Sequence, residues 1–82
     1  MSAAMDSSTD QVYVELLDEG TPCLRATLGV PLGDGVYQLL ATQEYDPEDE
    51  HWQFLPGSIV RCRKETWSGQ DILVARELAG LA

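Results

Sequence analysis

The sequence is poor in basic residues. It carries 5 Lys and Arg against 14 Asp and Glu, which gives a formal net charge of −9 over 82 residues. Non-specific nucleic-acid affinity comes from Lys and Arg that displace counterions from phosphates, and an anionic membrane surface attracts the same residues. The charge balance therefore argues against direct binding to DNA, RNA or a membrane, and it favours a basic protein or peptide as a partner.

Long apolar runs are missing as well. The longest, Ile72 to Ala75, has four residues, whereas a membrane-spanning helix needs about 20. Residues 1–10 contain neither a basic residue nor an apolar stretch, so they do not resemble a secretory signal and we expect a cytoplasmic protein. Cysteine is scarce: Cys23 and Cys62 are too few to staple a secreted scaffold, and both are interpreted as small buried hydrophobic residues.

The length allows a single domain. A chain of this size buries only about 60% of its unfolded surface, which leaves room for one core and none for a separate catalytic cavity. Residues 1–10 are mostly Ser, Ala, Asp and Thr, a composition that is typical of a disordered leader. We expect the folded domain over residues 11–79 and a short tail over residues 80–82.

Alternation of apolar and polar residues predicts strands, and Gly or Pro punctuation separates them. Gly33-Asp34-Gly35 is a strong hairpin signal, because glycine takes positive φ without a Cβ clash. The last segment is open to two interpretations. Ser68 with Asp71 could cap a helix, but the β-branched Ile72 and Val74 favour a strand. The expected strands cover residues 11–17, 23–32, 36–41, 58–65 and 72–79, with residues 52–55 returning to the core.

Five short strands joined by tight turns predict an all-β fold, a small five-stranded antiparallel barrel, since closure removes exposed sheet edges. On one expected strand Val60 and Cys62 share a face and Arg61 and Arg63 share the other. The residues expected to form the core include Val14, Val36, Leu39, Trp52, Phe54 and Val60.

The sequence resembles a group of small bacterial SH3-like barrel proteins with no assigned function. The resemblance rests on residues 12–20, 24–26, 32–37, 45–50 and 52–60, and it covers most of residues 11–79. It implies the barrel fold but no activity, because fold does not imply function. Cys23 stands where that group usually has a tryptophan and Thr27 where it often has a hydrophobic residue, so the surface near this strand is expected to differ.

His51 is the only histidine and follows three carboxylates. It could act as a general base, yet neither Cys23 nor Cys62 lies in a recognisable nucleophile motif. The same three residues could supply zinc ligands, but they lack the paired spacing that normally presets such a site. Counted from Asp46 as an EF-hand loop, the chain has His51 where glycine is needed and Gly57 where glutamate is needed. We therefore assign no catalytic residue, no metal site and no cofactor.

The same acidic segment is the best candidate for recognition. Carboxylates concentrated between residues 44 and 50 would attract a basic surface, and neighbouring aromatic rings could anchor it. A loop that merely keeps the protein soluble is the alternative. The expected partner-binding residues are Glu44, Tyr45, Asp46, Glu48, Asp49, Glu50 and Trp52.

Arg61, Arg63 and Lys64 hold three of the five basic charges. They could pair with the acidic loop within the same barrel, or they could form a small anion patch. We expect a monomeric, non-enzymatic module that binds a protein or peptide through residues 44–52. The alternatives are an acidic decoy that inhibits a nucleic-acid-binding protein, an accessory subunit of an enzyme, or a small hydrolase that uses His51.

Overall fold

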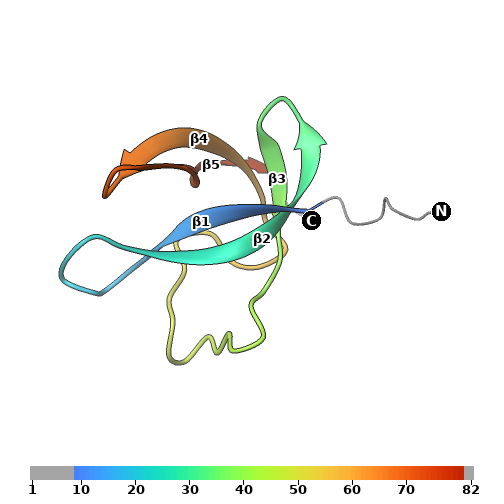
Figure 1. The fold of residues 1–82 in the computed structure, drawn as a ribbon. Helices are drawn as coiled ribbons and strands as arrows, with labels where there is room; N and C mark the ends of the chain where they lie inside the picture. The colour runs from blue at the N-terminus through green and yellow to red at the C-terminus, as the bar shows by residue number, and fades with distance from the viewer. Residues whose placement is uncertain (1–8, 81–82) are drawn as a thin grey trace.

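The computed structural model describes residues 9–80, which form five strands (Figure 1). Residues 1–8 of the expected leader and residues 81–82 of the expected tail lie outside the described part. The first strand begins at Asp10 and the last ends at Gly80. In chain order the strands are β1 (Asp10–Leu16), β2 (Cys23–Gly33), β3 (Val36–Leu39), β4 (Ile59–Trp67) and β5 (Gln70–Gly80).

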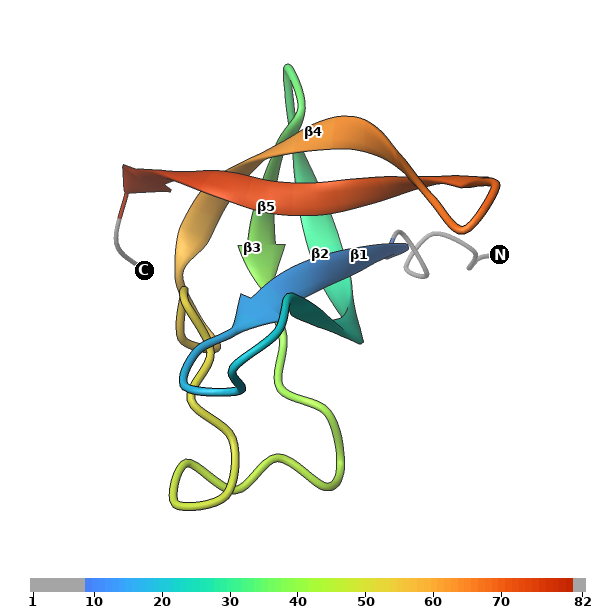
Figure 2. The same ribbon diagram turned by 90° about the vertical axis from the view of Figure 1, so that its left-hand side faces the viewer.

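Each strand pairs with the next in the sequence, and β5 returns to β1 to close the sheet into a barrel (Figure 2). The four consecutive pairs are antiparallel. Because five strands of alternating direction leave the first and last running the same way, the closing contact is parallel, and it consists of the bridge between Tyr13 and Val74. The expected fold class, a small all-β barrel of five strands with an SH3-like order, is confirmed.

The expected hairpin turn at Gly33 to Gly35 is confirmed by its backbone angles, since Gly33, Asp34 and Gly35 all have positive φ. A second tight turn, with positive φ at Ser68 and Gly69, joins β4 to β5. The structure also decides between a helix and a strand for the last segment. Residues 70–80 form a strand rather than a helix, because they pair with β4 along its whole length, with irregularities near Ile59 and Arg61.

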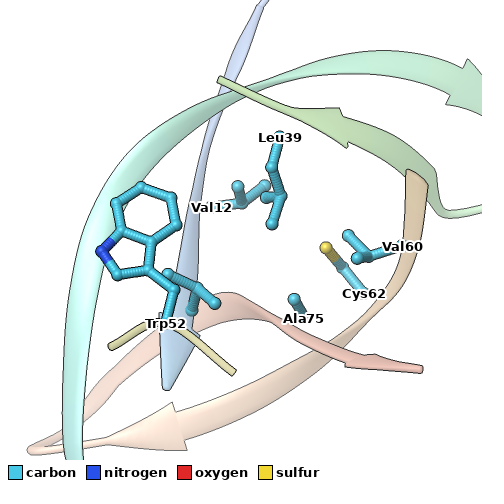
Figure 3. Close-up of a cluster of buried hydrophobic side chains, with 7 residues drawn as sticks. Val12, Leu39, Trp52, Val60, Cys62 and Ala75 are labelled. Carbon is cyan, nitrogen blue, oxygen red and sulfur yellow. The ribbon is translucent and has the colours of Figure 1, made fainter. Parts of the chain in front are cut away.

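The core fills the inside of the ring of strands (Figure 3). Its members come from β1, β3, β4, β5 and the connection before β4, and they are Val12, Val14, Leu39, Trp52, Val60, Cys62 and Ala75. Phe54 packs against this cluster and is half-buried, as is Val36. The outward face of β4 carries Arg61 and Arg63 as expected. Cys23 is only half-buried, so the expectation of two buried cysteines is right for Cys62 and wrong for Cys23.

Among residues 9–80, Thr27 is the one polar residue whose side chain is buried. Its hydroxyl donates a hydrogen bond of 2.5 Å to the Leu40 carbonyl, so the buried hydroxyl has a partner. An apolar residue at this position would leave the Leu40 carbonyl without that hydrogen bond. The bond also holds the chain that leaves β3 against β2. Within residues 9–80, no helix is long and apolar enough to cross a membrane.

Candidate functional site

The connection between β3 and β4 covers residues 40–58 and hangs below the barrel (Figures 1 and 2). Its second half is attached to β1. Leu16 and Trp52 form a β-bridge, the Leu17 amide donates to the His51 carbonyl at 2.7 Å, and the Gln53 amide donates to the Glu15 carbonyl at 2.8 Å. The loop is therefore fixed to the sheet at the end where β1 turns into β2.

The acidic segment within this loop is an ordered turn. The Glu48 amide donates to the Asp46 carboxylate at 2.9 Å, and the amides of Asp49 and Glu50 donate to the Asp46 carbonyl, both at 2.9 Å. Asp46 thus caps the turn that follows it, and Pro47 presets the backbone angle of its first residue. Glu48 and Asp49 are exposed on a backbone whose hydrogen bonds are satisfied internally.

Three of the expected partner-binding residues point towards the barrel instead. The Trp52 side chain is 3% exposed and belongs to the core, and its indole N–H donates to Glu50 Oε1 at 2.9 Å (Figure 3). The same oxygen accepts a hydrogen bond from Arg25 Nε at 3.1 Å. Tyr45 is half-buried and its ring meets that of Trp52 edge-on, with centroids 5.0 Å apart. Glu50, Trp52 and Tyr45 therefore hold the loop on the barrel, while Glu44, Asp46, Glu48 and Asp49 are exposed.

Two further carboxylates lie at the same end of the molecule, in the turn between β1 and β2. Asp18 Oδ2 lies 3.0 Å from His51 Nδ1, which brings this turn against the loop. The sequence interpretation treated Asp18 and Glu19 only as a break between strands, and their charge was the one signal that could have placed them in the site. We call this region the acidic end; its carboxylates are Asp18, Glu19, Glu44, Asp46, Glu48, Asp49 and Glu50.

Few cations balance these charges. Among residues 9–80, Arg25 pairs with Glu50 and His51 with Asp18. The other five carboxylates have no Lys, Arg or His within ion-pair distance in the same range: Glu19, Glu44, Asp46, Glu48 and Asp49. An uncompensated negative potential therefore surrounds this end of the barrel.

His51 and the cysteines do not form a catalytic or metal arrangement. The imidazole contacts Asp18, and both side chains are exposed. Burial raises the pKa of the Cys62 thiol to about 11, which disfavours the nucleophilic thiolate. Across the described residues, no group of three or more His, Cys, Asp or Glu side chains is placed to hold a metal ion.

The basic residues of β4 do not reach the acidic loop. Arg61 lies 3.7 Å from Glu77, its register partner on β5, and donates to the Asp34 carbonyl at 2.9 Å. Of the two alternatives for this cluster, pairing with residues 44–50 does not occur for Arg61, because the register of β4 and β5 supplies a nearer carboxylate. No ion pair involves Arg63 or Lys64 within the described part of the chain.

Sequence reasoning also missed the network around Arg76. Its guanidinium donates to both oxygens of Glu65 and to Glu15, so it joins β5 to β4 and to β1. Hydrogen bonds from Arg76 and from the Trp67 indole lower the pKa of Glu65 to about 2, and the Glu65 contact in turn raises the pKa of Arg76. This network is structural, because every charge in it has a partner.

Comparisons with protein-family models, with curated proteins and with solved structures found no match for this chain. The resemblance to small bacterial SH3-like proteins stays an expectation from the sequence.

Proposed function

We propose that this protein is a non-enzymatic binding module that recognises a positively charged segment of a protein partner through its acidic end. The observation that carries the proposal is the set of five carboxylates that have no ion-pair partner among residues 9–80, displayed on two turns that contact each other. In the rest of the described chain, Glu15, Glu65 and Glu77 are each paired with an arginine. Asp10, Asp34 and Asp71 also have no ion pair among residues 9–80, but they lie on separate elements rather than in one cluster.

The order of the loop supports recognition. A flexible acidic tail would attract cations equally well, but it would lose conformational entropy on binding. Here the Asp46 turn, the Glu50–Arg25 pair and the buried Trp52 hold the backbone in one position before any partner arrives. A basic segment therefore meets carboxylates that need no reorganisation, and the long-range field raises its rate of association.

The experiment uses a short lysine-rich peptide as the probe and full-length protein. The test variant carries Glu44→Gln, Glu48→Gln and Asp49→Asn, which leaves the Asp46 cap and the Glu50 contacts intact. The control variant carries Asp34→Asn, Asp71→Asn and Glu77→Gln, which removes the same number of charges outside the acidic end. Binding is measured at about 0.05 and about 0.5 M salt, where the Debye length is about 14 and about 4 Å.

We expect the wild type and the control variant to bind the peptide at low salt, and the test variant to bind at least several-fold more weakly. High salt should weaken wild-type binding to the level of the test variant. Equal loss in both variants would mean that net charge alone matters, and it would overturn the assignment of a site at the acidic end.

The acidic decoy is distinguished by the natural partner. Proteins captured from lysate by the wild type and not by the test variant are tested for nucleic-acid binding. A decoy competes with DNA or RNA for such a partner, whereas a general adaptor leaves that binding intact.

A further inference from the structure

A hollow on the outside of the barrel adjoins the acidic loop. Its volume is about 320 Å³, and it is lined by Gln11 of β1, by Ala26, Thr27 and Leu28 of β2, and by residues 41–43 beyond β3. None of these lining residues is charged, in a chain of net charge −9. The hollow is thus an uncharged surface of alanine, leucine, threonine and glutamine side chains, more apolar than polar, beside a strongly charged one.

The walls of the hollow are held in place by the barrel. Leu40 donates its amide hydrogen to the Leu28 carbonyl at 2.9 Å and accepts the Thr27 hydroxyl at its own carbonyl. These two bonds hold the chain that continues into residues 41–43 against β2. On the opposite side, the Gln11 side-chain amide donates a hydrogen bond to the Tyr13 hydroxyl oxygen at 2.8 Å. The hollow therefore exists before a ligand binds, which reduces the entropy cost of filling it.

The hollow opens on the side of the chain that leads into the acidic end. Thr42 lines it, and the Thr42 carbonyl accepts the Tyr45 amide in a turn at 3.2 Å, with Glu44 between them. Leu28 is about half exposed at the rim, and the neighbouring Leu40 is also exposed. An apolar group seated here would cover part of Leu28 and would lie beside the segment that leads to Glu44.

We propose that the hollow receives one apolar side chain of the same basic segment that binds the acidic end. Its volume is at the low end for ligand pockets, so it fits a single aliphatic or aromatic side chain rather than a large cofactor. The carboxylates select a cationic segment, and the uncharged hollow supplies an anchor of the kind that dominates binding energy at interfaces. The inference rests on the proposed function. It adds that the recognised segment carries an apolar residue flanked by lysines or arginines.

The test compares two lysine-rich peptides of equal charge, one with phenylalanine and one with alanine at the central position. Wild-type protein should bind the phenylalanine peptide about tenfold more tightly, a gain set by the apolar area removed from water. Ala41→Phe fills the hollow and should abolish this advantage. Ala79→Phe places the same ring on an exposed site of β5 outside the hollow, and it should retain the advantage. Thermal unfolding of both variants checks that they fold.

The loop variant separates the two proposals. Glu44→Gln, Glu48→Gln and Asp49→Asn should weaken both peptides and preserve the ratio between them. Equal affinity of both peptides for the wild type, or an unchanged ratio in Ala41→Phe, would overturn the hollow as an anchor site and leave the acidic end standing. If the loop variant binds both peptides as tightly as the wild type, the proposed function fails. In that case, a preference for the phenylalanine peptide that is lost in Ala41→Phe would still support the hollow. Absence of binding by either peptide would overturn both.

Discussion

Arg76 donates hydrogen bonds to both carboxylate oxygens of Glu65, with Nε 2.5 Å from Oε2 and Nη2 2.8 Å from Oε1. The same guanidinium reaches Glu15 on β1 at 2.8 Å. Because β1 and β5 share only one backbone bridge, this side-chain contact is a second tie across the line where the barrel closes. One arginine thus joins β5 to the preceding strand β4 and to β1, which is distant in the sequence.

Replacing Arg76 with Ala should destabilise the protein by about 1 to 3 kcal/mol, because it leaves two partly buried carboxylates facing each other without a cation. Arg61→Ala is the matched control, since its ion pair with Glu77 is longer and more exposed, and its loss should cost about 0.5 kcal/mol or less. Urea unfolding of both variants measures the difference. Equal effects would show that Arg76 does not hold the seam.

Glu65 should give the protein a specific sensitivity to acid. Its pKa is about 2 in the fold against 4.5 in the absence of these contacts. Between these two values the unfolded chain binds the proton and the folded protein does not, so the free energy of unfolding decreases as pH falls through this window. The difference in stability between wild type and Glu65→Gln should therefore shrink from pH 5 to about pH 2. A difference that is constant with pH would contradict the assignment.

The two cysteines should differ in reactivity towards a thiol reagent. Cys23 is half-buried at the start of β2, whereas Cys62 lies in the core with a thiol pKa of about 11. At mildly alkaline pH native protein should react quickly at Cys23 only, and Cys62 should react when the barrel unfolds. Cys23→Ser should abolish the fast phase, and rapid modification of native Cys62 would mean that the core opens more readily than its packing indicates.

Gly29 is required by close packing rather than by an unusual backbone angle. A Cβ at this position would lie 3.1 Å from the Tyr37 Cβ and 3.3 Å from a Val12 methyl. Gly29→Ala should therefore cost about 1 to 3 kcal/mol through crowding between β2, β3 and β1. Gly80→Ala is the control, because its Cβ would meet Ile59 at an ordinary 3.9 Å, and it should be close to neutral in thermal unfolding. Equal melting shifts for both variants would contradict the crowding.

The parts of this fold that were predictable from the sequence depend on neighbours along the chain. Gly33 to Gly35 predict a hairpin because positive φ is a property of the residues themselves, and the alternation around Val60 and Cys62 predicts which face of β4 is buried. The Arg76 network was not predictable, because Glu15 and Glu65 meet it only through the register of three strands. Trp52 was expected at the core and also as a partner anchor, and only its burial within the core cluster separates the two roles.

The candidate site, like the fold, was predictable only in part from the sequence. The carboxylates of residues 44–50 were predicted from their density, and the structure adds Asp18 and Glu19 because a histidine on the loop contacts the turn between β1 and β2. The inward direction of Glu50 depends on Arg25, which lies 25 residues away in the sequence. The hollow beside the loop has no sequence signature, because its walls come from three separate segments.

The parallel closing contact has a mechanical consequence. Because β1 and β5 run in the same direction, Asp10 at the start of β1 and Gly80 at the end of β5 lie at opposite ends of the barrel (Figure 2). Tension applied between these two residues slides β1 and β5 along each other. The Tyr13–Val74 bridge and the Arg76–Glu15 contact therefore carry the load together rather than opening one after the other. A pull from both ends therefore acts along the strands, and the loop of residues 40–58 lies outside the line of force.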